Sequence, residues 1–455
     1  MIDFAKYAQY SKAGPRYTSY PTANEFHEGF GEEEYKNALQ ASAPDSPLSL
    51  YVHIPFCRSA CYFCGCNVIY TSKEDKKERY ITYLAKELSL LSKALDTSRV
   101  VQQFHFGGGT PTFMEASQLK TIMTLIKATF PNFSPEAEVS CEIDPRYFSQ
   151  EHMEVLKESG FNRLSFGVQD FDSCVQEAIH RTQSVEVVQE AVALARKFGI
   201  HSINFDLIYG LPHQNFERFA TTLKAVVALS PDRLAVFNYA HVPWMKKTMR
   251  KIDETTLPEP SEKLRILEHT IDFLKQHGYE MIGMDHFAKP EDELFKALQR
   301  GSLRRNFQGY TTKGGSQTIG IGLTSIGEGD TYYAQNAKEM EPYERALDAG
   351  RLPIVKGIAL GDDDCLRKEV IMTLMNNFWL SFGAIEEKYG IQFREYFADA
   401  LTELKEYEDA GLLKIGEREI VATPTGGMLI RNIAMPFDAF LKKAPIGERK
   451  FSKTV

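Results

Sequence analysis

The sequence predicts an α/β protein built on an open, partial (β/α)6 TIM-like barrel, with an N-terminal arm and a mainly helical C-terminal domain. Short β-rich runs alternate with helix-period segments from residue 48 to about residue 240, which is the pattern of a parallel sheet with crossover helices. Eight such units would close a full barrel, so six favour an open one whose active face lies at the C-terminal ends of the strands. Helical periodicity dominates again after residue 361.

The β-rich runs and the helices between them have recognisable ends. The six runs cover residues 48–54, 100–106, 137–143, 163–168, 201–208 and 233–237. Apolar spacing predicts helices over 76–94, 184–198 and 216–229. Gly199 is placed to end the second helix, and Pro231 to end the third, because helices rarely continue into a proline.

The predicted domain boundaries follow these patterns. Residues 1–47 form an N-terminal arm over the active site, residues 48–360 the barrel and its extension, and residues 361–455 the helical C-terminal domain. Prolines favour extended backbone in the arm, at residues 14–22. The arm either lies on the main domain as an ordered segment or covers a pocket with its tyrosines and arginine.

The C-terminal domain combines helices near 363–377 and 394–411 with a short pair of strands near 412–421 and an apolar helix near Met428. Helices followed by a small hairpin resemble a winged helix, a fold often used on DNA. Because no basic recognition helix appears, we expect a lid or docking module instead.

Composition limits the possible functions. The chain has 455 residues, a net charge of −8 and 43% hydrophobic residues, so it is globular and long enough for two or three domains. A negative net charge does not favour binding to nucleic acid. No apolar run approaches the roughly 20 residues needed to cross a bilayer. We therefore expect a cytoplasmic protein with no nucleic-acid or membrane partner. A local basic pocket for an anionic substrate is still compatible with the negative net charge of the whole chain.

Four of the seven cysteines lie within ten residues, directly after the first strand: Cys57, Cys61, Cys64 and Cys66. A disulfide framework is not expected in a large chain with an odd cysteine count, and structural zinc prefers paired Cys-x2-Cys knuckles. Ferredoxin clusters use Cys-x2-Cys-x2-Cys with a remote fourth cysteine. The spacing Cys-x3-Cys-x2-Cys instead predicts a [4Fe-4S] cluster with three thiolate ligands and one iron open to a substrate or cofactor.

Glycine, carboxylate and amide groups follow the next strands. Three glycines at 107–109 let the backbone approach a ligand closely and offer unhindered N–H and C=O groups. Glu142 and Asp206 end the third and fifth strands, where a carboxylate can accept hydrogen bonds from ribose hydroxyls. Each feature alone is weak evidence for a binding site, since glycine-rich turns and carboxylates at helix N-termini are common. Their joint position after successive strands predicts one binding rim.

The cysteine loop, with Phe63 before its third cysteine, resembles the signature of the radical S-adenosylmethionine (SAM) superfamily. The whole chain resembles the oxygen-independent coproporphyrinogen III oxidases, also called coproporphyrinogen dehydrogenases, within that superfamily. The motifs that carry this resemblance are PRYTSYPTA (15–23), YVHIPFC and CYFCGCN (51–67), FGGGTPT (106–112), EIDPR (142–146), GVQDF (167–171), DLIYGLP (206–212), FNYAH (237–241), GMDHFA (283–288), NFQGYTT (306–312) and RNI (431–433). They span every predicted domain.

The resemblance implies a radical SAM oxidoreductase of haem and porphyrin biosynthesis. Such an enzyme converts two propionate side chains of coproporphyrinogen III to vinyl groups, giving protoporphyrinogen IX. One electron from the reduced cluster cleaves SAM, and the resulting 5'-deoxyadenosyl radical removes hydrogen from the propionate β-carbon before carbon dioxide is lost. It further implies a low-potential electron donor protein as partner, and we expect a monomer.

The resemblance also assigns residues. Cys57, Cys61 and Cys64 match the cluster ligands and are therefore the catalytic and metal-binding candidates, while the role of Cys66 stays open. Two SAM molecules are implied, one on the cluster and one beside it. The positions associated with SAM, which the resemblance does not divide between the two molecules, are Tyr51, Phe63, Gly108, Gly109, Thr110, Glu142, Gln169, Arg181, Asp206, Ala240 and Ile326.

Other polar residues have weaker assignments. Arg16, Arg304 and Arg305 are candidates for binding the four carboxylates of the substrate, although an exposed basic loop explains the arginine pair equally well. We expect the thiols of Cys141, Cys174 and Cys365 to be buried and structural. The four strand-end histidines, His53, His105, His241 and His286, have no partner at metal-ligand spacing, so we expect hydrogen-bonded side chains.

Two alternative functions differ at identifiable positions. A haem chaperone with the same cluster loop typically carries Phe where this chain has Cys66, and lacks the NFQGYTT and PRYTSYPTA segments. A simple electron-transfer iron–sulfur protein would need neither the glycine run at 107–109 nor the carboxylates of the rim. The sequence therefore favours the oxidase.

Overall fold

The computed structural model describes residues 7–10, 12–443 and 451, and the contacts of the chain divide it into two compact units. The barrel unit comprises Phe26–Ile266 and Gly315–Ala359. The second unit comprises Met1–Glu25, Leu267–Gly314 and Leu360–Val455. These units group residues by contact rather than by sequence position, and the domain boundaries at 47 and 360 stay predictions, as does the arm over the active site.

Six parallel strands form the centre of the barrel unit. They are β1 (Leu48–Ile54), β4 (Val101–Gly108), β5 (Phe133–Ile143), β6 (Arg163–Gln169), β7 (Ser202–Tyr209) and β8 (Arg233–Asn238), and each pairs with the next in this order. The six predicted β-rich runs are thus confirmed as strands. Because the pairing is parallel throughout, the C-terminal ends of all six strands share one edge, where the predicted rim residues are found.

The barrel is open, as predicted. Among the described strands, β1 pairs with β4 and β13 and has no hydrogen-bonded pairing with β8. Four further strands extend the sheet beyond β1: β13 (Gln317–Ile321), parallel to β1, and then antiparallel β14 (Ile326–Glu328), β15 (Tyr332–Asn336) and β16 (Ile354–Ala359). The sequence predicted an extension up to residue 360 but not these four strands, because they are short and each depends on pairing with a neighbouring strand.

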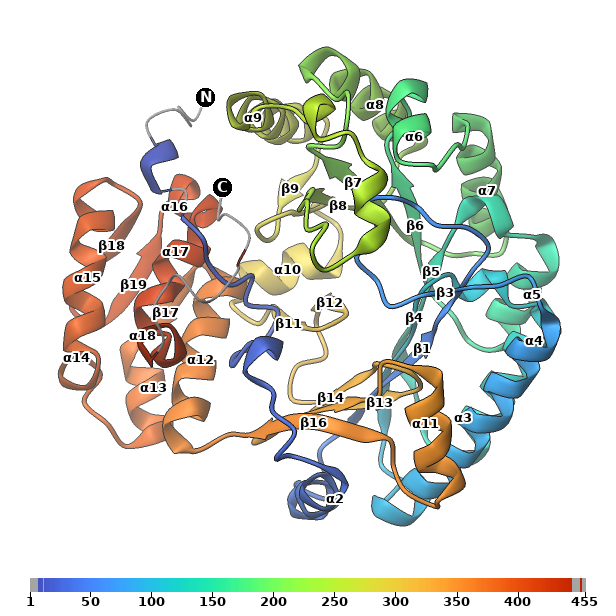
Figure 1. The fold of residues 1–455 in the computed structure, drawn as a ribbon. Coiled ribbons are helices and arrows are strands. Elements are labelled where there is room, and N and C mark those ends of the chain that lie inside the picture. The colour runs from blue at the N-terminus through green and yellow to red at the C-terminus, as the bar shows by residue number, and fades with distance from the viewer. Residues whose placement is uncertain (1–6, 11, 444–450, 452–455) are drawn as a thin grey trace. The chain divides into compact units, whose positions relative to one another are not determined.

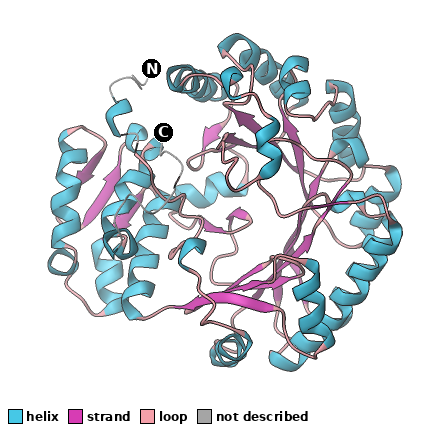
Figure 2. Cartoon of the chain, viewed as in Figure 1, coloured by secondary structure: helices cyan, strands magenta, loops and turns pink. Residues whose placement is uncertain are grey.

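Helices cover the outer face of the parallel strands (Figure 1). In chain order they are α3 (Glu74–Ala94), α4 (Ala116–Thr129), α5 (Gln150–Glu158), α6 (Ser173–Ala178), α7 (Val185–Lys197) and α8 (Phe216–Leu229). Each long helix buries one apolar stripe, which in α3 includes Leu84, Leu88 and Leu91. Figure 2 shows the resulting layers, with strands inside and helices outside. The barrel unit also contains α2 (Glu32–Ala41) and α11 (Met340–Asp348).

The second unit is mainly helical. Its helices after residue 360 are α12 (Asp362–Asn377), α13 (Phe382–Tyr389), α14 (Phe393–Tyr396), α15 (Ala398–Asp409), α16 (Pro424–Met428), α17 (Ile430–Ala434) and α18 (Ala439–Lys443). Its elements before residue 315 include β9 (Glu280–Met281), β10 (His286–Ala288), α10 (Glu293–Gln299), β11 (Arg304–Asn306) and β12 (Gly309–Thr311). Helix α9 (Pro260–Gln276) begins in the barrel unit and ends in the second unit.

Two details of the second unit differ from the sequence predictions. The helix expected over 394–411 is two helices, α14 and α15, separated at Phe397, whose buried ring packs against Phe393 and Phe437. The expected strand pair is a three-stranded sheet, because β17 (Trp379–Ser381) pairs with β19 (Glu419–Ala422) beside β18 (Leu413–Ile415). None of the described helices is long and apolar enough to span a membrane.

N-terminal residues belong to the core of this unit. The buried rings of Tyr17 and Tyr20 lie in its apolar cluster, and the Tyr17 hydroxyl donates to Asp438 Oδ2 at 2.9 Å. Arg431, also buried, donates from Nε to the Pro15 carbonyl at 2.9 Å and from Nη2 to the Gly14 carbonyl. These bonds fix the polypeptide at residues 14–20 to the C-terminal helices.

Candidate active site

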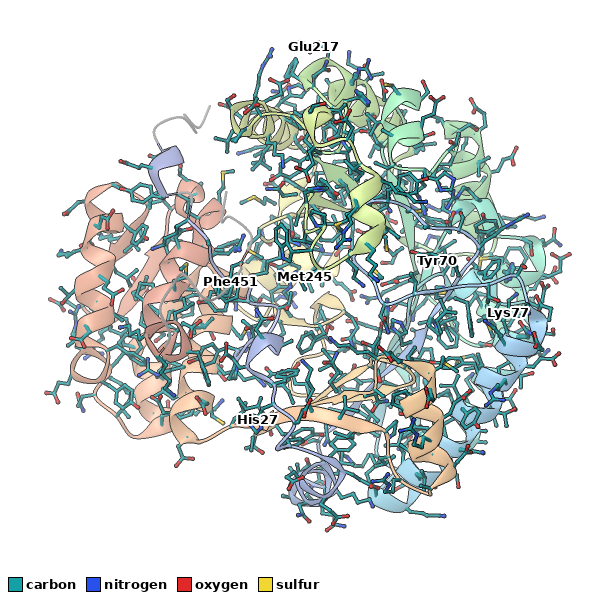
Figure 3. The ribbon with its side chains drawn as sticks, viewed as in Figure 1. His27, Tyr70, Lys77, Glu217, Met245 and Phe451 are labelled. Atoms are coloured by element: carbon teal, nitrogen blue, oxygen red, sulfur yellow. The ribbon has the colours of Figure 1, made fainter. Side chains whose placement is uncertain are left out.

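A cavity of about 220 Å³ lies at the C-terminal ends of the barrel strands. Its wall comes from the cysteine loop and from the residues that end β4, β5, β6 and β7. The lining residues are Cys57, Arg58, Ser59, Cys61, Phe63, Cys64, Cys66, Val68, Tyr70, Gly108, Gly109, Thr110, Glu142, Ile143, Asp144, Arg146, Tyr147, Ser165, Gly167, Gln169, Arg181 and Asp206. Of these, Tyr70 is labelled in Figure 3.

The cysteine loop is closed by two short parallel strands, β2 (Phe56–Cys57) and β3 (Ile69–Tyr70). The amide of Ile69 donates to the Pro55 carbonyl at 2.7 Å, and that of Thr71 to the Cys57 carbonyl at 3.2 Å. A chain segment of about ten residues is thereby held as one loop over the cavity. This geometry explains how cysteines close in sequence present their sulfur atoms to the same space.

Each of the three predicted ligand thiols has its own polar neighbour. Cys57 Sγ lies 3.4 Å from Thr110 Oγ1, and Arg181 Nη1 donates to Cys61 Sγ at 3.7 Å. The amide of Cys66 donates to Cys64 Sγ at 3.4 Å. Hydrogen bonds to sulfur stabilise thiolate ligands and adjust the properties of a bound cluster.

The thiols differ in acidity. Burial raises the pKa of Cys57 to about 12. The pKa of Cys64 is lowered because the Cys66 side chain donates a hydrogen bond to its sulfur, and the pKa of Cys66 is raised by the same bond.

The cavity fits an iron–sulfur cluster, because Cys57, Cys61 and Cys64 all line it and a cluster binds each thiolate at a different iron. The backbone is also kept clear beside Cys57. A Cβ atom at Gly109 would lie 3.0 Å from Cys57 Sγ and 2.8 Å from the Phe56 carbonyl oxygen, so only glycine fits there.

The glycine run at the end of β4 is held by the neighbouring strand. Gly108 has φ +122°, and its amide donates to Glu142 Oε2 at 3.1 Å. The other carboxylate oxygen of Glu142 lies 3.3 Å from His105 Nε2. Because 43% of the Glu142 side chain is exposed, the carboxylate keeps acceptor capacity for a ligand in the cavity.

Arg181 links three parts of the wall. Its side chain is 8% exposed, and it donates from Nη1 to Asp144 Oδ2 at 2.9 Å and from Nη2 to the Gly167 carbonyl at 2.7 Å. Its Nε is buried without a hydrogen-bond partner among the described residues. An orphaned donor in the wall of a polar cavity is expected to have a partner when a ligand is bound.

Asp144 receives two guanidinium groups. Arg146 donates to it from Nε at 2.9 Å and from Nη2 at 2.6 Å, in addition to the bond from Arg181. Burial alone would raise the pKa of Asp144, but the two arginines outweigh it and the pKa is lowered. Asp144 is therefore a fixed negative charge that orients Arg181.

Asp206 and Gln169 complete the inner wall. Asp206 accepts from Ser165 Oγ at 3.1 Å and from Asn204 Nδ2 at 2.8 Å, and burial raises its pKa to about 6. Gln169 has φ +67° at an irregularity in the β6–β7 pairing. The next residue, Asp170, holds this backbone in place, since its fully buried carboxylate accepts from Gln214 Nε2 at 2.6 Å and from Thr222 Oγ1 at 2.7 Å.

The structure brings most of the predicted site residues together, but three do not line the cavity. Tyr51 lies behind the wall, where its ring stacks on His105 at 5.9 Å and its hydroxyl lies 3.0 Å from His53 Nδ1. Ala240 follows the end of β8, and Ile326 begins β14. In the second unit, the predicted substrate arginines Arg16 and Arg305 both face the buried carboxylate of Asp285, Arg16 at 3.6 Å.

The remaining cysteines and the strand-end histidines have distinct environments. Cys141 is fully buried as expected, but Cys174 and Cys365 are only half-buried, so the expectation for them was wrong. Each of the four strand-end histidines has a hydrogen-bonding neighbour, as predicted.

The cavity wall also contains residues that no sequence pattern indicated. Ser165 was not predicted, although it shares the inward face of β6 with Gly167 and Gln169 at alternate positions. Arg146 and Tyr147 carry no such periodic signal, because they lie in the 3-10 turn after β5.

Comparisons with known proteins agree with this geometry. The family model of the radical SAM superfamily matches residues 51–226, and that of the HemN C-terminal domain matches residues 360–429. The chain is 62% identical to the oxygen-independent coproporphyrinogen III oxidase of Helicobacter pylori strain J99, over 100% of this chain and 99% of the relative. It is 47% identical to the enzyme of the same name from Escherichia coli K12, over 97% and 96%.

A solved structure is similar along nearly the whole chain. It is that of coproporphyrinogen III oxidase (HemN) from Escherichia coli, which is described as a radical SAM enzyme. The TM-score is 0.91 and the identity 47%, and the match covers 94% of this chain and 98% of that one. The likeness therefore includes both compact units.

Proposed function

The chain belongs to the oxygen-independent coproporphyrinogen III oxidases of the radical SAM superfamily, and we propose that it converts two propionate side chains of coproporphyrinogen III to vinyl groups, giving protoporphyrinogen IX. The observation that carries this proposal is the full-length identity of 62% to an enzyme of that name. The haem-chaperone alternative is not favoured, since the high-identity relatives are named as oxidases. The chain is accordingly an oxidoreductase of porphyrin biosynthesis.

Membership of the superfamily implies a [4Fe-4S] cluster and SAM. When bound, these groups supply the 5'-deoxyadenosyl radical that removes a hydrogen atom from the substrate propionate. In our proposal Cys57, Cys61 and Cys64 hold the cluster, supported by their common position on the cavity wall. Cys66 lies in the same wall, and its bonds to Cys64 Sγ suit a residue that supports a ligand.

The residues of the rim have distinct proposed roles toward SAM. The carbonyls of Gly108 and Gly109 accept from the amino group, because the amides of these residues already donate to Glu142 Oε2 and to the Ile54 carbonyl, and Thr110 lines the same wall. Glu142 accepts from the amino group, and Asp206 from a ribose hydroxyl, since both carboxylates line the cavity. Arg181, with its orphaned Nε, donates to the ligand and is oriented by Asp144.

The other assignments rest on the family resemblance. Phe63 and Gln169 line the cavity and are proposed to contact SAM directly. Tyr51, Ala240 and Ile326 do not line it, and their proposed role is to shape the site from outside the cavity. We also propose that two SAM molecules bind, as in the resemblance, and that Arg16, Arg304 and Arg305 meet substrate carboxylates.

We further propose a cytoplasmic monomer that receives electrons from a low-potential donor protein and has no nucleic-acid or membrane partner. The net charge of −8 supports the absence of a nucleic-acid partner, because binding to phosphate backbones needs a basic surface. Sedimentation of the purified protein tests the monomeric state.

The experiment that tests the function is anaerobic. The protein is reconstituted with iron and sulfide, and SAM, a strong reductant and coproporphyrinogen III are added. Protoporphyrin fluorescence, after oxidation of the product, and 5'-deoxyadenosine are then followed together. Both products should form in the wild type and be absent in Cys57→Ser.

The variant Cys365→Ser is the matched control, since it makes the same chemical change at a residue outside the cavity lining. It should retain both products. Deoxyadenosine without porphyrin product in the wild type would contradict the proposed substrate, and absence of both would contradict the radical chemistry.

A further inference from the structure

A basic segment lies beside the cysteine loop and has no role in the proposed chemistry. It comprises residues 243–251, with the sequence PWMKKTMRK. Four of its nine residues are lysine or arginine and none is acidic, although the whole chain carries a net charge of −8. A positively charged segment on a negatively charged protein can direct an acidic partner to one place on the surface.

The basic segment has an inner and an outer face. Met249, and Ile252 directly after the segment, are 3% and 5% exposed and pack in an apolar cluster with Tyr62 and Phe63 of the cysteine loop. On the outer face, Trp244 is 56% exposed and Met245 is 69% exposed, and Met245 is labelled in Figure 3. Lys247, Arg250 and Lys251 are exposed beside them.

Short contacts lead from this segment to a proposed cluster ligand. Lys246 Nζ donates to the Cys66 carbonyl at 2.9 Å, and the Cys66 amide donates to Cys64 Sγ at 3.4 Å. Lys251 Nζ also lies 4.9 Å from the ring centroid of Tyr62. The path from Lys246 to the Cys64 sulfur therefore consists of two hydrogen bonds and the backbone of Cys66.

We propose that the basic segment is the docking surface for a small acidic flavoprotein that supplies electrons one at a time. This inference rests on the proposed function, which requires a reductant for the cluster. In each transfer the reduced flavin of the carrier loses one electron, which passes to the cluster held by the cysteine loop. No covalent bond forms or breaks between the two proteins.

The chemistry of the surface selects this partner. Acidic side chains around the flavin edge of a carrier would pair with Lys247, Arg250 and Lys251, which increases the rate of encounter at low salt. The flat ring of Trp244 and the flexible Met245 offer apolar contact for an exposed edge of the flavin ring. A small patch with charged groups around exposed apolar side chains suits the weak, short-lived complexes of electron transfer, which bury less than about 1,200 Å².

The test compares binding with chemistry in the reconstituted holoenzyme. The probe is a purified acidic flavodoxin, and its dissociation constant is measured by calorimetry at low and high salt. One variant reverses charge, Lys247→Glu with Arg250→Glu, and a second removes the apolar contacts, Trp244→Ala with Met245→Ala. Lys93→Glu with Lys197→Glu is the matched control, because it makes the same charge change at exposed residues of α3 and α7.

We expect the charge-reversed variant to bind flavodoxin about tenfold more weakly at low salt, with a smaller salt dependence, and the control to bind as the wild type does. The apolar variant should bind more weakly at both salt concentrations. Formation of deoxyadenosine with dithionite, a small reductant that needs no docking surface, should be the same in all of them.

Three results would overturn the inference. They are wild-type affinity in both segment variants, equal weakening in the control, and tighter binding of an acidic [4Fe-4S] ferredoxin than of flavodoxin. Failure of the proposed function would look different, since the wild type would then form no deoxyadenosine with dithionite. The comparison of dissociation constants still decides the docking surface in that case.

Discussion

Arg181 Nη1 lies 2.9 Å from Asp144 Oδ2, and the same nitrogen lies 3.7 Å from the sulfur of Cys61. One guanidinium therefore connects a fixed carboxylate to a proposed cluster ligand. Its Nη2 donates one N–H to the Gly167 carbonyl and keeps a second, and Nε has no partner among the described residues, so both nitrogens can donate to a ligand. The position of Arg181 thus depends on contacts with three separate strands or loops.

Replacing Arg181 by lysine should weaken SAM binding about tenfold or more, because a single ammonium cannot reproduce the planar set of donors. Iron and sulfide content should change little, since the three cysteines are intact. The measurement is equilibrium dialysis of SAM with the reconstituted protein. Arg196→Lys is the matched control, as Arg196 pairs with Asp232 at 2.8 Å and does not line the cavity. Equal SAM affinity in wild type and Arg181→Lys would contradict the assignment.

Gly109→Ala should lower the iron content after reconstitution, because the new Cβ would lie 3.0 Å from Cys57 Sγ and 2.8 Å from a backbone oxygen. The matched control is Gly65→Ala, which lies in the cysteine loop itself but places its Cβ in open space. Iron analysis and the visible absorption of the cluster give the readout. If both variants took up iron like the wild type, the close approach at Gly109 would have no role in cluster binding.

The affinity for SAM should rise as pH increases from about 5 to 7 if Asp206 accepts a hydrogen bond from SAM. The pKa of this carboxyl is raised to about 6 by burial, so the ionised acceptor forms only above that value. We expect a change of about tenfold, the effect of a hydrogen bond to a charged group. In Asp206→Asn the affinity for SAM should no longer depend on pH in this range. If its pH profile were the same as that of the wild type, Asp206 would not be the source of the dependence.

Glu87 should make the protein less stable as pH rises from about 4.5 to 7. The carboxyl is 1% exposed, and burial raises its pKa from 4.5 to about 7 despite hydrogen bonds from Tyr343, Gly322 and Asn336. Between those two values the folded protein binds a proton that the unfolded chain has released, so the free energy of unfolding falls with increasing pH, by about 3 kcal/mol at most.

Urea unfolding of wild type and Glu87→Gln at pH 5 and pH 8 measures this contribution. The variant should be less stable than the wild type at pH 5, by about 1–3 kcal/mol, because the amide places a donor against Asn336. The difference should be smaller at pH 8, where the wild type carries a buried charge. An identical difference at both pH values would show that Glu87 does not titrate in this range.

Much of the barrel could be predicted because its signals are local. Alternation of β-rich and helical segments located the six parallel strands, and Gly199 and Pro231 marked helix ends within a residue or two of α7 and α8. The extension from β13 to β16 could not be predicted in the same way. Strands of three to six residues such as β14 carry too few alternating positions to be recognised, and they form because β1 offers an edge for β13.

The sequence by itself determined which chemistry the protein can perform, since the spacing of Cys57, Cys61 and Cys64 and the glycines at 107–109 are properties of short segments. Only the tertiary structure decided which distant groups surround them. Arg181 is 120 residues from Cys61, and Lys246 is 180 residues from Cys66, yet each pair is in contact. Such contacts depend on the packing of whole strands and loops, and that packing is a property of the folded sheet rather than of any local pattern of residues.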